Sequence, residues 1–293
     1  SGKGLAAMSR FIFAQRPDPA LRVDTRGFLK MSNLKTWLRL SMAALPFAVL
    51  AACATKQPPE PVAVVKPSAD QQLSQLFKDS DETNLRLNPI NALARGDMRY
   101  ADRVGDYLSD EYAAAVYQAK QQDLARLATI DRSALSPDNA IYYDVFKYET
   151  ELALRFASKP LETIQTQLPI DHFYGMHTFF PDLSSGQSIA PYKTVKDYED
   201  GLKRMDNFVV IMDRAIVRMR EGINAGHVQP QVVVNNVIGQ LDTIIKQGVE
   251  NSTYYLPIKN MPADFSASDK ARLTQAYQDK IANTILPVYQ RLK

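Results

Sequence analysis

The sequence predicts an all-α fold for residues 69–293, and three observations carry this prediction. Apolar residues at positions 198, 202, 205, 209, 212, 216 and 219 recur in alternating steps of four and three, which is the spacing of one face of a continuous helix. Helix start signals recur along the chain, among them Ser136-Pro137, a capping serine followed by proline at the first helical position. No two segments form a convincing pair of strands.

Three helices are expected in the first part of this region, over residues 69–87, 110–130 and 136–158. Leu73, Leu76 and Phe77 mark one face of the first helix. The second helix is expected to turn four residues inward: Tyr112, Val116, Leu124 and Leu127. The Ser136-Pro137 signal opens the third.

A longer helix is expected to begin at Thr194, where Asp197 three residues later gives the pattern of a capping box. Gly222 and Gly226 suit its end. Its three methionines, at heptad spacing, are typical of a hydrophobic core rather than of a strip that binds a soft metal: Met205, Met212 and Met219.

Two more helices are expected after it, over residues 230–249 and 266–292. The last one carries Tyr277, Ile281, Ile285 and Val288 on one side. We expect this side to be the most exposed apolar patch of the chain, and such patches favour association.

The helical period breaks between residues 159 and 193, a long aromatic segment that includes His172 and His177. We expect a loop with short turns lying over the helices. One hypothesis is that its aromatic residues and prolines form a wall of a peptide cleft, with His177 as a polar contact. The residues of this wall would be Phe173, Tyr174, Phe179, Phe180 and Pro181. The alternative is a loop packed on the helices, with its histidines bonded to the backbone.

Cys53, the only cysteine of the chain, ends an apolar run that reads LPFAVLAAC over residues 45–53. A lone cysteine cannot close an intramolecular disulfide. Lys35 and Arg39 precede an apolar segment that has the length of a signal-peptide core and is too short to span a bilayer stably. Leu50-Ala51-Ala52-Cys53 has the form of a bacterial lipobox, so we expect Cys53 to be the lipidated first residue of the mature protein. The alternative is a buried helix with an ordinary core cysteine.

This interpretation divides the N-terminal part of the chain into three pieces. Residues 1–30 are an upstream extension, from upstream translation, a misplaced start or a cloning remnant; residues 31–52 are a lipoprotein signal peptide. Residues 53–68, which hold four prolines, form a lipidated, semi-extended tether before the helical domain of residues 69–293. Because Ala54 rather than aspartate follows the cysteine, we expect an outer-membrane lipoprotein that faces the periplasm.

The charge balance argues against nucleic acid as a partner. The whole chain has a formal net charge of +3, but residues 1–52 contain 8 of its 35 basic and 2 of its 32 acidic residues. Residues 53–293 therefore keep 27 basic and 30 acidic residues, a net charge of −3. Nucleic-acid binding would need a basic face or stripe, and none is visible.

Motifs for catalysis are absent from the sequence. A zinc peptidase helix needs His-Glu-x-x-His, because a spacing of four places both imidazoles on one face and the glutamate activates water. His172 and His177 are five residues apart, and His227 stands alone. No G-x-S-x-G, phosphate-binding glycine loop or cysteine–histidine pair occurs either. We therefore assign no catalytic, cofactor-binding or metal-ligating residue to this chain.

Five segments in order resemble the N-terminal half of the bacterial family called domain of unknown function 885. They are RLNPINALARGDMRYADRVGDYLSDE (86–111), ALSPDNAIYYDVFKYE (134–149), TVKDYEDGLKRMDNF (194–208), MREGINAGHVQPQVVVNNVIGQL (219–241) and ILPVYQRL (285–292). The resemblance covers residues 70–293, nearly the whole helical part.

This resemblance implies a large, mostly helical, zinc-dependent peptidase of the gluzincin type, similar in layout to neurolysin-like and angiotensin-converting-enzyme-like peptidases. The His-Glu-x-x-His-type motif of such proteins lies in a C-terminal half, so the resemblance transfers no ligand or catalytic residue to this chain. Zinc and a peptide substrate are implied only for a full-length relative, and the missing C-terminal half is an expected partner. The alternative function is a non-enzymatic helical periplasmic lipoprotein that acts as a binding or scaffold module.

Overall fold

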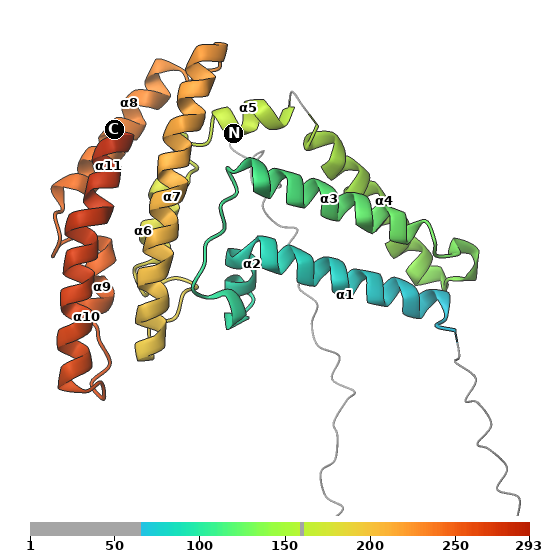
Figure 1. Ribbon diagram of the computed structural model, residues 1–293, viewed down its shortest axis with the longest axis horizontal. Helices are drawn as coiled ribbons and strands as arrows, with labels where there is room; N and C mark the ends of the chain where they lie inside the picture. Colours follow the sequence, from blue (N-terminus) through green and yellow to red (C-terminus); the bar gives the residue numbers. More distant parts are fainter. Residues whose placement is uncertain (1–65, 159–160) are drawn as a thin grey trace, which may run out of the picture. The chain divides into compact units, whose positions relative to one another are not determined.

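All regular elements are helical within residues 66–158 and 161–293, the part of the chain that the computed structural model describes (Figure 1). The predicted all-α class is therefore confirmed for these residues. The upstream extension, the signal peptide, Cys53 and the tether up to residue 65 lie outside the described residues. No helix within the described ranges is long and apolar enough to cross a membrane.

Three helices of the first part pack side by side: α1 (Ala69–Leu87), α3 (Asp110–Leu127) and α4 (Pro137–Phe156). The first begins at residue 69, as predicted, because the side chain of Ser68 caps it in a reciprocal capping box with Gln71. The three helices share a small core of buried residues: Leu73, Leu76, Leu127 and Ile130. The rings of Phe77 and Phe146 pack against this core with their centroids 5.0 Å apart. Two short elements, α2 (Pro89–Ala94) and η1 (Met98–Tyr100), follow α1, and η2 (Arg132–Ala134) precedes α4.

The longest helix is α7 (Val195–Ala225), which the capping box of Thr194 and Asp197 opens as predicted. It ends at Gly226, whose left-handed φ of +79° a residue without Cβ adopts at little cost. Met205 and Met212 are fully buried and Met219 packs against the same core. The predicted role of these methionines in the core is confirmed.

The C-terminal helices complete the larger core: the last two pack on α7, and the first packs on the last one (Figure 1). They are α8 (Gln231–Lys246), the short η3 (Thr253–Tyr255) and α9 (Leu256–Lys259), and then α10 (Ala267–Lys280) and α11 (Leu286–Leu292). The last two are joined without a break by a π-helical turn at residues 281–285, labelled η4. Pro287 follows this turn; proline has no N–H to donate, and the wider turn is where the helix accommodates it.

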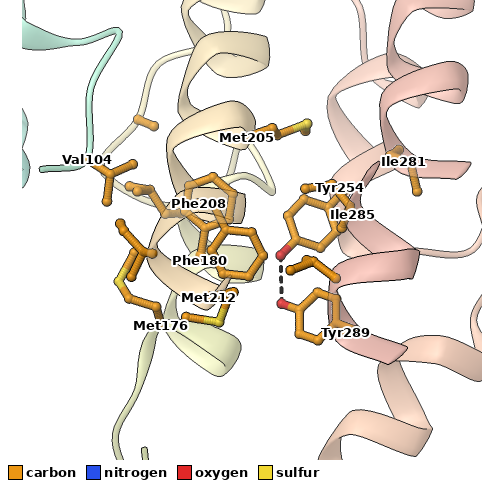
Figure 2. Close-up of a cluster of buried hydrophobic side chains, with 14 of the residues drawn as sticks. Val104, Met176, Phe180, Met205, Phe208, Met212, Tyr254, Ile281, Ile285 and Tyr289 are labelled. Carbon is orange, nitrogen blue, oxygen red and sulfur yellow. Dashed lines mark hydrogen bonds between the residues drawn. The ribbon is translucent and has the colours of Figure 1, made fainter. Parts of the chain in front are cut away.

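The prediction of an exposed patch on the last helix is wrong. Tyr277, Ile281, Ile285 and Val288 each have an exposed fraction of 0%. They pack with Phe208 and Met212 of α7 in the larger of the two cores, part of which Figure 2 shows. The apolar side of the last helix was identified correctly from the sequence. It is buried because it packs against the apolar side of α7 in the same chain.

The prediction that residues 159–193 form a loop is also wrong in part. Two helices lie within this segment, α5 (Leu161–Gln167) and α6 (Met176–Leu183). Each spans only about two turns, too short for a helical period to be recognised, and α6 contains Pro181 near its end. Helix α6 packs on α7 and places Phe180 in the larger core. Burial of this side chain, rather than local helix propensity, therefore accounts for the helix.

Polar contacts tie residues 104–110 to the outer side of α7. The side chain of Asn207 accepts a hydrogen bond from the Val104 N–H (3.3 Å), and Arg214 forms a bidentate ion pair with Asp106 (2.8 and 3.0 Å). Arg218 donates both to the carbonyl oxygen of Leu108 (3.0 Å) and to the carboxylate of Asp110, the first residue of α3 (2.6 Å). The segment between η1 and α3 is therefore fixed along α7.

Candidate functional site

His177, the polar contact that the sequence suggests for a peptide cleft, lies in α6 with an exposed fraction of 0%. Its Nε2 lies 3.2 Å from Oε1 of Gln240 on α8, and Nε2 of the same glutamine donates to the carbonyl oxygen of His172 (2.9 Å). Since the amide nitrogen of Gln240 is engaged there, its oxygen accepts from His177, and the histidine carries its proton on Nε2.

Burial keeps this imidazole neutral. Burial lowers the pKa of His177, and the hydrogen bond to Gln240 and the charge of Asp171 oppose this only partly. Its Nδ1 is buried and has no hydrogen-bond partner among the described residues. A protonated ring would therefore place an N–H at a position without an acceptor, which disfavours the charged form further.

Two tyrosines extend the polar network into the core. The hydroxyl of Tyr289 donates to the carbonyl oxygen of His177 (2.9 Å), and the hydroxyls of Tyr254 and Tyr289 lie 2.7 Å apart (Figure 2). Because Tyr289 gives its single proton to His177, Tyr254 must be the donor in the second bond. Burial raises the pKa of both tyrosines, so the network is uncharged near neutral pH.

Gly175 makes the close packing of His177 possible. Its φ of +148° lies in a region that is essentially restricted to glycine. A Cβ at this position would lie 2.6 Å from Nδ1 and 2.9 Å from Cε1 of the His177 ring. Any other residue would meet both backbone strain and the imidazole.

The network supports a pair of exposed aromatic residues, Phe173 and Tyr174, which we call the aromatic tip. Their exposed fractions are 74% and 77%. The carboxylate of Asp171 accepts from the N–H groups of both (2.6 and 2.8 Å), and the Asp171 N–H donates to the carbonyl oxygen of Tyr174 (2.9 Å). The turn that presents the two rings is therefore ordered by its own hydrogen bonds.

Other aromatic residues of the segment do not join the aromatic tip. Phe180 is fully buried and stacks on Phe208 of α7 with ring centroids 4.4 Å apart (Figure 2). Pro181 is buried, and Phe179 is 39% exposed. The structure thus separates the five residues of the sequence hypothesis into the exposed pair of the aromatic tip, the buried Phe180 and Pro181, and the partly exposed Phe179.

The described residues do not assemble a zinc site. No group of three or more His, Cys, Asp or Glu side chains in these ranges could hold a metal ion. The Nε2 of His177 is bonded to Gln240, and Nδ1 of His227 lies 2.6 Å from Oε1 of Gln167 at the end of α5. The zinc implied by the family resemblance therefore does not fit the described residues of this chain.

Sequence reasoning did not single out four residues of this site: Gly175, Gln240, Tyr254 and Tyr289. Gln240 and Tyr289 lie on helices whose period predicts only the apolar face, and their polar groups meet His177 only after folding. The Tyr-Gly pair at 174–175 was the one local signal, since glycine after an aromatic run suggests a special backbone conformation.

Comparison with known proteins places the chain in a family. The family described as "Bacterial protein of unknown function (DUF885)" matches residues 89–293. The chain belongs to the DUF885 family. No curated protein matches this DUF885 chain.

One solved structure resembles this DUF885 chain in fold, described as that of "the putative lipoprotein from Colwellia psychrerythraea". The two share 15% sequence identity with a TM-score of 0.60. The match covers 77% of the present chain and 40% of the other, so this chain spans less than half the length of that neighbour. At this identity the likeness concerns the fold alone.

Proposed function

We propose that the chain is the N-terminal helical part of an exported, lipid-anchored protein whose full-length form resembles a zinc-dependent peptidase. The observation that carries this proposal is the DUF885 match over residues 89–293 together with a structural neighbour of which it spans 40%. A neighbour that much longer leaves room for a second half that supplies the metal site. The residues present here would then contribute substrate contacts rather than chemistry.

The lipid anchor in this proposal is Cys53. The sequence before Cys53 has the basic start and the apolar segment of a signal peptide and the small residues of a lipobox. The proline-rich segment that follows Cys53 suits a tether. The description of the structural neighbour as a lipoprotein is consistent with this role. Ala54 favours the outer membrane, with the helical domain facing the periplasm.

The proposed substrate contact is the aromatic tip, with His177 behind it as a positioning residue. Exposed aromatic rings on an ordered turn present a large apolar area at low entropic cost, which suits the binding of an extended peptide. His177 is fully buried, so it acts through the turn of residues 171–174 rather than by direct contact.

A non-enzymatic binding module is the second candidate, and the aromatic tip favours it equally. An aromatic pair held by a buried network can bind a partner protein without any chemistry. The two candidates differ in what the reading frame beyond Lys293 encodes.

The test compares this chain with a version that includes the downstream reading frame. Zinc content is measured by atomic emission, and cleavage of a peptide mixture is followed with and without a chelator. We expect equimolar zinc and chelator-sensitive cleavage only in the longer protein. A longer protein without either property would favour the binding module, and zinc-dependent cleavage by the present chain alone would overturn the proposed division of roles.

A further inference from the structure

The outer face of α4 carries an apolar stripe that the described residues leave largely exposed. The inner side of this helix packs on α1 and α3 through Tyr143, Phe146 and the buried Thr150. On the other side, five apolar residues follow one another in steps of four, three, four and four, and we call them the α4 stripe: Ile141, Val145, Tyr148, Leu152 and Phe156. Ile141 and Tyr148 are each 60% exposed.

Single exposed apolar residues are ordinary on a protein surface, but a continuous stripe along a whole helix is not. The α4 stripe keeps to one side of the helix from residue 141 to residue 156, so it extends over about 23 Å. A helix that is apolar on two sides is expected to be covered on both. The question is what covers the second side.

The chain that precedes α1 bears on this question. The first turns of α1 and α4 are bonded to each other, since Oδ1 of Asp70 accepts from the Ser136 N–H (3.1 Å) and from Nδ2 of Asn139 (2.8 Å). Residues 53–68 lead directly into α1 and can span at most about 50 Å when fully extended. A bilayer that holds Cys53 is therefore always within reach of the α4 stripe, and tethering raises the effective concentration of the two surfaces.

We propose that the α4 stripe is a membrane-contacting surface whose occupant is the zwitterionic phospholipid interface of the bilayer that holds Cys53. This inference rests on the lipid anchor of the proposed function. Tyr148 and its exposed neighbour Tyr142 suit that occupant, because the amphipathic tyrosine ring is favoured where acyl chains meet headgroups.

The charges on α4 favour zwitterionic over anionic headgroups. Asp144 is paired with Arg132 (2.5 Å), and Lys147 lies 3.9 Å from Glu151. Asp138, Glu149 and Arg155 remain, and no ion pair involves them among the described residues. On this surface the positive and negative charges nearly balance, with a slight excess of negative charge. It therefore gains no electrostatic attraction from anionic headgroups, unlike the lysine-rich helices that bind them.

The lone cysteine makes a direct test possible. When lipid occupies Cys53, a cysteine introduced elsewhere is the sole free thiol of the mature protein. We would label Tyr148→Cys, and Asn236→Cys on the exposed side of α8 as the matched control, with a polarity-sensitive nitrobenzoxadiazole dye. Each lipidated protein is reconstituted into phosphatidylcholine–phosphatidylethanolamine vesicles that contain nitroxide-labelled acyl chains.

We expect the dye at position 148 to shift to the blue and to be quenched by the nitroxide lipids, whereas the dye at position 236 does neither. Adding Ile141→Asp and Val145→Asp should abolish the quenching at 148, and phosphatidylglycerol in the vesicles should reduce it. These two positions are exposed, so the helical circular dichroism spectrum should be unchanged.

Equal quenching at both positions, or none at 148, would overturn the membrane contact. It would equally be overturned if Ile141→Asp changed the oligomeric state in sedimentation while the quenching stayed, because the stripe would then be an interface between proteins. A failed anchor is recognised separately, since an unlipidated Cys53 would itself react with the dye and the protein would not stay on the vesicles.

Discussion

The hydroxyl of Tyr289 on α11 donates a hydrogen bond to the backbone carbonyl oxygen of His177 on α6, 112 residues earlier in the chain. Tyr254 donates in turn to Tyr289, and Gln240 engages the His177 ring. The four residues come from four separate elements, so this network fixes the C-terminal helices to the segment that presents the aromatic tip.

Removal of one hydroxyl should measure the contribution of this network. In Tyr289→Phe, the carbonyl oxygen of His177 and the hydroxyl of Tyr254 both lose their partner in a fully buried place. Buried unsatisfied groups cost about 1–3 kcal/mol each, so we expect the free energy of unfolding in urea to fall by about that amount or more. Tyr142→Phe on the exposed side of α4 is the control and should leave the unfolding midpoint unchanged. An equal effect of both variants would contradict the role of the network.

Gly175→Ala should destabilise the protein through both strain and collision. A φ of +148° costs a residue with Cβ about 1–3 kcal/mol, and the new methyl group would lie 2.6 Å from Nδ1 of His177. Gly239→Ala in α8 is the matched control, because no atom lies within 4 Å of its Cβ position. That substitution should raise stability by about 1 kcal/mol through higher helix propensity. Thermal unfolding of the two variants should therefore shift in opposite directions.

Stability should decrease on mild acidification because of His177. Its pKa is lowered in the folded protein, so below an unfolded-state pKa near 6.5 the unfolded chain binds more protons than the folded one. The free energy of unfolding should therefore fall as the pH drops from about 7 toward the lowered pKa of the folded state. Carboxylates with lowered pKa, such as Asp70, Asp79 and Asp97, lose their contribution only at more acidic pH.

The pH effect can be assigned with a substitution that does not titrate. His177→Gln should be less stable than the wild type at pH 7.5, and its unfolding free energy should change less between pH 7.5 and 5.5. Chemical denaturation at several pH values measures both quantities. If the two proteins showed the same slope over this interval, another group would be responsible for the decrease.

Lipidation is the prediction that concerns residues outside the described ranges. Cys53→Ser removes the acceptor thiol, so we expect an uncleaved precursor in cells that process lipoproteins. Mass spectrometry of the purified wild type should find diacylglycerol and an N-acyl group on Cys53. An unmodified thiol at the N-terminus of the native protein would exclude the lipid anchor.

The sequence was sufficient for the long helices and insufficient for the short ones and for the packing partners of each helix. Helix α7 was predictable because a 31-residue element repeats its apolar period many times and has a capping box at its start. Helices α5 and α6 were not, because two turns give too few repeats and α6 owes its existence to the burial of Phe180. The apolar side of α10 and α11 was recognised as a contact surface, yet sequence periodicity does not say which other surface covers it.

The same distinction applies to the candidate site. His177 could be singled out as a histidine in an aromatic segment, but a single sequence does not reveal whether its ring faces solvent or core. Its partners Gln240 and Tyr289 lie 63 and 112 residues away. Long-range polar pairs of this kind leave no local pattern, so only the folded chain identifies them.

The bonds between Asp70 and the start of α4 have a mechanical consequence. Any tension that reaches the domain from residues before Ser68 enters the fold at the first turn of α1, where a free helix end would unwind residue by residue. Oδ1 of Asp70 also holds the Ser136 N–H and the Asn139 side chain, so the load is divided between two parallel helices from the second residue onward. Unwinding the first turn of α1 under such a pull must therefore also break its hydrogen bonds to the start of α4.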